Sequence, residues 1–244
     1  MVRWFWQRRR PPGRILRLRS RDEASDVRRV DFQQLAPDVA TYLGQAAYLQ
    51  LGYAETLSSV IERSPELSHK ESLSRATGAA LLKHQALVEL IRDRGDDPLE
   101  LMLPFREPLD AFRMATHGVR PLETMLTVHV TAGLLDDFYL SLSGSYGDTG
   151  RRSAAILRAD ADRSPLVAIV SEAIATDDEL RSLLSLWGRR LVGDTLLVAR
   201  GALRSSTTER RGALDLDDEK QVEPVFTQLL GAHSRRMTSM GLDA

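Results

Sequence analysis

The most informative stretch of the sequence is Thr127-Val-His-Val-Thr-Ala-Gly-Leu-Leu-Asp-Asp-Phe-Tyr139, the middle of a long predicted helix. Residues at spacings of three and four share one helical face, and here that face holds Leu122, Met125, His129, Gly133, Asp136 and Leu140. His129 and Asp136 are polar, and another acid, Asp137, lies one step away. Burying such groups is costly unless they are paired or bind a cation. The stretch therefore predicts a central helix whose polar residues are able to bind protons or a metal.

Further helical patterns flank this stretch. Three prolines, Pro104, Pro108 and Pro121, interrupt residues 98–120, so we expect short helical pieces there, with their apolar side chains buried. No segment shows the alternation typical of a β-strand. We expect longer helices over residues 37–63, 68–95, 121–143, 149–162 with a continuation over 166–175, 177–203 and 218–240. Two long helices, a long linker and two more helices predict an all-α, ferritin-like four-helix bundle with additional C-terminal helices.

The charge of the chain is distributed unevenly. Residues 1–30 hold ten arginines and three acids, a charge of +7, whereas the whole chain carries −1, which leaves −8 for residues 31–244. The basic segment contains Trp4-Phe-Trp6 and Pro11-Pro-Gly13. We expect residues 1–30 to form a disordered basic arm and residues 31–244 to form the helical domain. Such an arm either stays solvated or makes weak contact with an anionic membrane or a nucleic acid.

Several classes of protein are excluded by composition and motifs. The chain has no cysteine, which rules out disulfides, thiolate metal sites and cysteine nucleophiles. No apolar run approaches the roughly 18 residues of a membrane span, and no signal-peptide core follows the basic segment. We therefore expect a cytoplasmic protein. The sequence also lacks the glycine-rich loops that bind nucleotide phosphates and the nucleophile elbow of hydrolases.

Two more polar residues fall within apolar helical patterns. His84 recurs at spacings of three and four with Leu73, Ala76, Ala80, Leu87 and Ile91. It is either a neutral core histidine bonded to a neighbour or a ligand. Glu55 lies within the apolar part of the first helix, where it either reaches solvent at the edge or faces the bundle. The one Glu-x-x-His pair, Glu66 and His69, directly follows Pro65 at a helix start, away from any core face.

The run Trp187-Gly-Arg-Arg-Leu-Val-Gly-Asp194 is distinctive, and its two glycines indicate close helix packing. Together with other stretches, this run resembles the ferritin-like proteins grouped with the methylthio-isopentenyladenosine tRNA hydroxylase, especially their actinobacterial branch. The resemblance covers about residues 31–241. Its other matching stretches are Leu43-Gly-Gln-Ala-Ala-Tyr-Leu-Gln-Leu51, Glu55, Lys83-His84, Pro104-Phe105, Thr131-Ala-Gly-Leu-Leu-Asp-Asp-Phe138 and Ala232-His-Ser-Arg-Arg-Met237.

The resemblance implies a ferritin-like bundle and, in active members of the family, a non-haem di-iron centre that hydroxylates with O₂. It matches Glu55 to the first-helix glutamate, His84 to the second-helix histidine, and Asp136 or Asp137 to the third-helix acid. The Glu-x-x-His pattern of such centres is missing, because Leu81 stands at the glutamate position before His84.

The fourth helix also departs from the family pattern. It offers only Asp160 and Asp162, and no histidine lies between residues 129 and 233. The sequence thus predicts a degenerate centre without a cofactor, whose vestigial metal residues are Glu55, His84, His129, Asp136 and Asp137. The alternative is a single iron held by Glu55, His84 and either His129 or Asp136.

Two hypotheses about function follow from these interpretations. The first is a non-catalytic scaffold or binding protein on a ferritin-like bundle. The alternative is a non-haem iron hydroxylase that acts on modified tRNA or another substrate. The sequence specifies no partner, and it leaves open whether the protein forms a homodimer.

Overall fold

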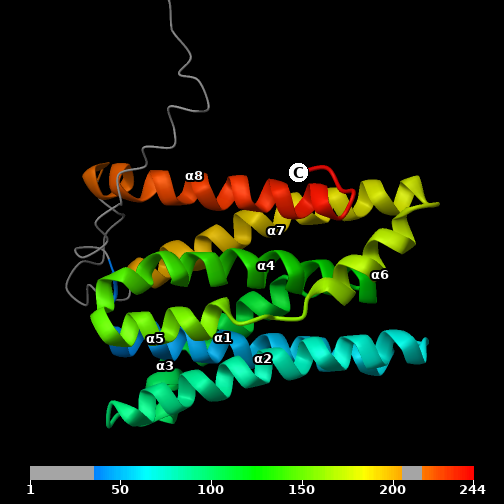
Figure 1. Ribbon diagram of the computed structural model, residues 1–244. Helices are drawn as coiled ribbons and strands as arrows, with labels where there is room; N and C mark the ends of the chain where they lie inside the picture. Colours follow the sequence, from blue (N-terminus) through cyan, green and yellow to red (C-terminus); the bar gives the residue numbers. More distant parts are fainter. Residues whose placement is uncertain (1–35, 205–215) are drawn as a thin grey trace, which may run out of the picture.

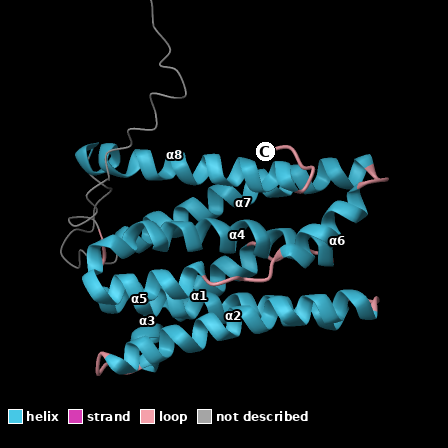
Figure 2. Cartoon of the chain, viewed as in Figure 1, coloured by secondary structure: helices cyan, strands magenta, loops and turns pink. Residues whose placement is uncertain are grey.

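The computed structural model describes residues 36–204 and 216–244. Within these ranges the chain forms helices and no strand, so the prediction of an all-α fold is confirmed (Figure 2). The elements are α1 (Val39–Arg63), α2 (Leu67–Asp93), α3 (Pro98–Ala115), α4 (Pro121–Leu142), the 3₁₀ turn η3 (Ser143–Tyr146), α5 (Gly147–Arg158), α6 (Ser164–Ile174), α7 (Asp178–Arg204) and α8 (Leu216–Ser239).

Helix α4 lies at the centre of the molecule. It packs against α1, α5, α6, α7 and α8, and Figure 1 shows it between the α7 and α8 layer and the layer that contains α2. Sixteen of its 22 residues are buried, and they lie on all sides of the helix. A helix that is apolar all round is buried in the interior. The central position that the sequence predicts for this helix is confirmed.

Local signals set the ends of the first two helices. The Asp38 carboxylate accepts a hydrogen bond from the Thr41 backbone N–H at 2.9 Å, which caps the first turn of α1. Helix α1 ends at Arg63, just before Pro65. Helix α2 is followed by Gly95, whose φ of 85° is accessible to glycine at little cost. Both helices pack against each other, and α3 packs on α1.

The expectation of short helical pieces over residues 98–120 was wrong. Helix α3 is continuous through Pro104 and Pro108. Both prolines are exposed and lie four residues apart, on one face of the helix. The backbone carbonyls that lose their partners on this face are accessible to water, so the helix tolerates both residues. The expected burial of its apolar residues was also only partly right, because Leu99 and Leu103 are 73% and 62% exposed.

The fourth helix of the bundle is divided, as the sequence predicts. Helices α5 and α6 are separated by residues 159–163, and Asp162 has a φ of 43°. This interruption lies next to α2 and α4, both of which contact α5 and α6. It places the side chain of Arg163 near the centre of the bundle.

Close packing explains one glycine of the Trp187–Asp194 run. A Cβ on Gly188 would lie 2.2 Å from the Met237 methyl group on α8. The other glycine, Gly193, has nothing within 4 Å of an added Cβ, so the prediction of close packing was wrong there. Gly133 on α4 is also tightly covered, because its Cβ would lie 2.3 Å from Nε of Arg236.

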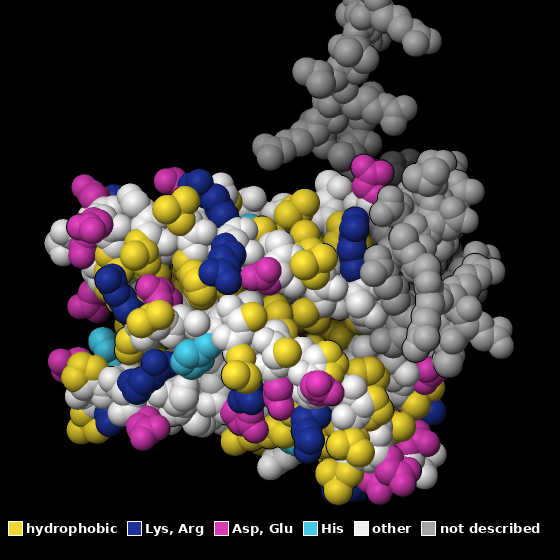
Figure 3. All heavy atoms as spheres, turned by 180° about the vertical axis from the view of Figure 1, so that it is seen from behind, with side chains coloured by type: hydrophobic (Ala, Val, Ile, Leu, Met, Phe, Trp, Pro, Cys, Tyr) yellow, Lys and Arg dark blue, Asp and Glu magenta, His cyan; other side chains and the backbone are white. Residues whose placement is uncertain are grey.

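The surface seen from behind carries hydrophobic, acidic and basic side chains interspersed with one another (Figure 3). None of the described helices has an apolar stretch long enough to cross a bilayer. The predicted basic arm, residues 1–30, lies outside the described residues.

Candidate functional site

Asp136 of α4 is the acid at the centre of the bundle, and its side chain is 8% exposed. Its Oδ1 accepts a hydrogen bond from Nε2 of Gln50 at 2.8 Å. Its Oδ2 lies 2.9 Å from Nη2 of Arg163 and 3.7 Å from Nζ of Lys83. One buried carboxylate thus meets an amide and two cations, which come from α1, the α5–α6 interruption and α2. We call Asp136, Lys83, Arg163 and Gln50 the central ionic cluster.

Lys83 is the most deeply buried cation of the cluster, with 3% of its side chain exposed. Its ammonium donates a hydrogen bond to the backbone oxygen of Leu157 at 2.7 Å. Burial lowers the pKa of Lys83 from its usual value, while the negative charge of Asp136 opposes this change. A buried ammonium is tolerated because its charge pairs with Asp136 and one of its donors bonds to Leu157.

Arg163 closes the cluster from the interruption between α5 and α6. Its side chain is 22% exposed, so it reaches from the surface to Asp136. Its second guanidinium nitrogen, Nη1, is buried and has no hydrogen-bond partner. The cluster therefore carries two positive charges around one carboxylate.

The residues that the sequence singled out as metal ligands do not gather at one point. Glu55 is exposed and pairs with Arg113 of α3. His84 is half-buried, and its Nδ1 lies 2.9 Å from the backbone oxygen of Ala47. This contact matches the first of its two alternatives, a histidine bonded to a neighbouring group. Asp137 pairs with Arg236 of α8. Of the predicted set, only Asp136 belongs to the central ionic cluster.

His129 of α4 is in an unusual environment. Both ring nitrogens are buried and lack a hydrogen-bond partner. Burial, followed by the positive charges of Arg163 and Arg236, lowers the pKa of His129 to about 4. The ring is therefore neutral near pH 7.

The arrangement does not fit a di-iron centre. Such a centre needs several carboxylates and two histidines around two metal ions. In the described part of the chain, no group of three or more His, Asp or Glu side chains is placed to hold a metal ion. At the bundle centre, an ammonium and a guanidinium occupy the positions around the carboxylate where cations would bind. Whether the chain binds a metal elsewhere or weakly stays a prediction.

The sequence reasoning missed Lys83 and Arg163. Lys83 fits a seam with Ala76, Ala80 and Leu87 at spacings of three and four as well as His84 does. That spacing is a signal that could have found it, but a lysine is rarely fully buried unless it is paired. Arg163 directly precedes the recognised Ser164-Pro165 break. Nothing in the sequence indicates that this arginine turns inward.

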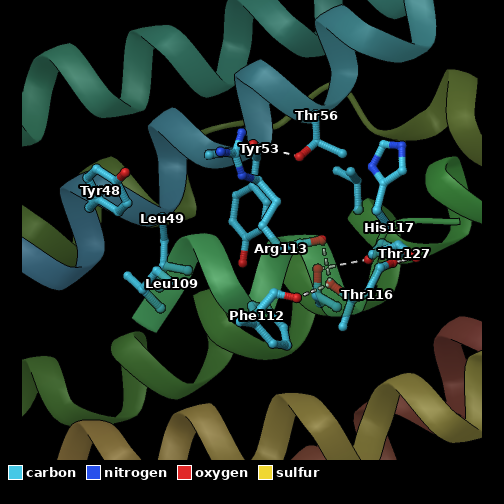
Figure 4. A pocket seen from close by; sticks show the side chains of 13 residues that line it. Tyr48, Leu49, Tyr53, Thr56, Leu109, Phe112, Arg113, Thr116, His117 and Thr127 are labelled. Carbon is cyan, nitrogen blue, oxygen red and sulfur yellow. Dashed lines mark hydrogen bonds between the residues drawn. The ribbon is translucent and has the colours of Figure 1, made fainter. Parts of the chain in front are cut away.

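A small pocket, with a cavity volume of about 30 Å³, lies beside the cluster between α1, α3 and α4. Figure 4 shows Tyr53 extending from α1 into it, with Phe112 and Leu109 of α3 on the opposite wall. Tyr53 and Val128 also line a second cavity, of about 20 Å³, whose walls include Gln50, Asp136 and Arg163. Tyr53 thus stands between the open pocket and the central ionic cluster.

The rim of the pocket carries two arginines, of which Arg113 is paired with acids. Arg113 bonds to Glu55 and, at 3.1 Å, to Asp110. Nη2 of Arg63 lies 3.0 Å from Nε2 of His117. Partial burial and then the two arginines lower the pKa of His117, so this ring is neutral near pH 7.

One known protein family matches most of the chain. A family model described as a ferritin-like domain of actinomycetes matches residues 33–208. The chain belongs to this family. The ferritin-like fold predicted from the helix order is thereby confirmed, and the match covers α1 to α7 but not α8. No curated protein matches the sequence.

Proposed function

We propose that this ferritin-like protein is a non-catalytic binding or scaffold protein whose bundle centre is held by side-chain charges. The observation that supports this most is the placement of Lys83 and Arg163 on Asp136, at 3.7 and 2.9 Å. The carboxylate is the one predicted third-helix ligand that lies at the centre of the bundle. Its oxygens already accept hydrogen bonds from Gln50 and Arg163, and Lys83 forms an ion pair with it.

Electrostatics argues against a divalent cation at this point. Two unit charges 4 Å apart interact by about 4 kcal/mol at an effective dielectric of 20. A divalent metal at the carboxylate would experience that repulsion from both Lys83 and Arg163. It would also have to displace the hydrogen bond from Arg163. The ammonium and guanidinium are therefore proposed to take over the charge-balancing role that metals have in other ferritin-like bundles.

A titration tests this proposal. The purified protein is incubated with excess Fe²⁺ in air, desalted and analysed for iron, beside an Asp136→Asn variant. We expect far less than one iron per chain, with the same trace amount in both proteins. Retention of two irons per chain in the wild type, lost in the variant and accompanied by iron–oxo absorption, would contradict the proposal.

The second candidate function is a non-haem iron hydroxylase, grouped with the enzyme that acts on methylthio-isopentenyladenosine in tRNA. The sequence run from Trp187 to Asp194 and the pocket that reaches Tyr53 beside Asp136 favour this candidate. It predicts O₂ consumption when iron and a reductant are supplied. Absence of O₂ consumption above that of the Asp136→Asn variant would remove it.

The basic segment 1–30 adds a proposal about partners. Its charge of +7 supports weak, non-specific contact with an anionic membrane, to which Trp4-Phe-Trp6 would contribute interfacial aromatic rings. Deletion of residues 1–30 should abolish binding to anionic vesicles and leave the melting temperature of the bundle unchanged. Equal vesicle binding by the deleted and full-length proteins would contradict it.

A further inference from the structure

Helix α7, which lies with α8 on one side of α4 (Figure 1), presents two leucines and a glycine to solvent on one face. Leu186 and Leu197 are 64% and 68% exposed, and Gly193 between them is also exposed. Single exposed leucines are common on protein surfaces, but a glycine inside an exposed helix lowers its stability. No group of the described chain lies within 4 Å of a Cβ added to Gly193. Packing within the chain therefore does not account for this glycine.

Two opposite charges accompany these residues. Arg190 and Asp194 form a loose pair along α7, with 3.8 Å between Nε and Oδ2 and with side chains that are 61% and 37% exposed. Because successive residues of a helix are about 100° apart, both lie on the same flank of the face, whereas Arg189 lies on the other flank. We call the set the α7 face: Leu186, Arg190, Gly193, Asp194 and Leu197.

The α7 face is complementary to itself when a second copy of α7 runs antiparallel to the first. A two-fold axis that passes between residues 191 and 192 places Leu186 opposite Leu197 of the second copy, and the reverse. The same register places Arg190 opposite Gly193 of the second copy, where the missing side chain leaves room for the arginine. Asp194 of the second copy then lies one residue, about 1.5 Å, further along the helix and on the same flank as Arg190. A parallel pairing would instead bring the two copies of Arg190 together.

We propose that two copies of this chain associate through the α7 face, as a two-fold symmetric pair of antiparallel α7 helices. The leucines supply apolar contact, and Gly193 permits the close approach of the second helix. The pairs between Arg190 of one copy and Asp194 of the other set the register, because only unlike charges meet in it. This association goes beyond the proposed function and does not depend on what the bundle centre holds.

Charge reversal tests the pairing, with sedimentation of the full-length protein over a concentration series as the measurement. In Arg190→Asp and in Asp194→Arg, each dimer loses two ion pairs and gains two contacts between like charges. At a factor of about 2.3 for each of these exposed contacts, self-association should weaken roughly 30-fold. An equimolar mixture of the two variants restores both ion pairs between unlike chains, so it should associate. The mixture also separates this effect from the contact of Arg190 with the Trp187 ring, which Arg190→Asp loses and the mixture does not restore.

Two matched controls isolate the α7 face. Arg189→Asp makes the same change of charge on the other flank and should not weaken self-association. Leu197→Glu should weaken it, whereas Leu82→Glu on α2, where the leucine is 67% exposed, should not. Melting of each variant in dilute solution reports on the single chain, because association stabilises the folded state only at concentrations near or above its Kd.

We expect the wild type to show a reversible equilibrium between monomer and dimer, which each charge reversal shifts toward the monomer and the mixture shifts back. Three results would overturn the proposal. The first is a wild type that stays monomeric up to millimolar concentration. The second is a dimer that Arg190→Asp, Asp194→Arg and Leu197→Glu leave intact. The third is a mixture of the two charge-reversed variants that associates no better than either variant alone.

Discussion

The replacement of Asp136 by asparagine tests the central ionic cluster. The change keeps the shape of the side chain and its contact with Gln50, but it removes the negative charge opposite Lys83 and Arg163. Lys83 is 3% exposed, so in the variant its ammonium is left with the Leu157 carbonyl as its hydrogen-bond partner. Removing one partner of a buried ion pair typically costs about 3–5 kcal/mol. Arg163 is 22% exposed and is able to turn toward solvent, which places the expected loss near the lower end.

Urea unfolding at pH 7 measures this loss. We expect Asp136→Asn to lower the free energy of unfolding by about 3 kcal/mol. For a chain of this size, such a loss corresponds to a melting temperature lower by roughly 6–12 °C. The matched control is Asp137→Asn on the next residue, whose carboxylate is 38% exposed and pairs with the part-exposed Arg236. Exposed pairs contribute at most about 1 kcal/mol.

A double variant completes the test. Lys83→Met combined with Asp136→Leu removes both buried charges, and it should recover most of the stability that Asp136→Asn loses, since apolar replacement of a buried pair is often neutral. If Asp136→Asn costs under about 1 kcal/mol, or no more than Asp137→Asn, then Asp136 and Lys83 do not form the coupled buried pair described above.

Three further predictions concern other core residues. Acid should destabilise the protein through His129, because its folded pKa of about 4 lies below the unfolded value of 6.5. The stability present above pH 6.5 is therefore lost as the pH falls toward 4, by roughly 3 kcal/mol. Urea unfolding midpoints at pH 7 and pH 4.5 measure this loss, and His129→Leu should reduce the difference between them. Tyr53→Phe should leave stability unchanged or raise it, because it removes an unpaired hydroxyl, whereas Tyr42→Phe should cost about 1 kcal/mol in the same unfolding assay. Gly193→Ala should raise the melting temperature, because it gains helix propensity and meets nothing, whereas Gly188→Ala should raise it less, because its Cβ must displace the buried Met237 methyl group.

The sequence was sufficient for the fold because long helices have a strong periodic signal. The apolar pattern around residues 127–139 predicted α4, and its burial on all sides confirms the central position. Pro65 and Gly95 marked the ends of α1 and α2 closely. The failure at α3 has a local cause, since Pro104 and Pro108 face solvent, and a sequence alone does not say which way the freed carbonyls point.

The candidate site was only partly predictable. Asp136 was found because an acid in an apolar seam is conspicuous. His84 and Lys83 fit the same seam, and the choice between them depends on a few tens of degrees of helix rotation that spacing does not fix. Glu55 shows the same ambiguity, because it lies at the edge of an apolar stretch and its partner, Arg113, comes from the misjudged helix α3. The inward position of Arg163 depends on the backbone path of an irregular segment, and such a segment has no periodic pattern from which the position could be predicted.

Unfolding with and without metal tests the account's main statement, that charged side chains rather than bound metal hold the bundle centre. The wild-type protein is unfolded by heat after exhaustive chelation, and again under anaerobic conditions with Fe²⁺ in hundred-fold molar excess over the protein. A ligand that binds only the folded state stabilises it by about 2.7 kcal/mol at a concentration 100 times its Kd. We expect the two melting temperatures to coincide. A melting temperature that rises by several degrees with iron, and a rise that disappears in Asp136→Asn, would contradict it.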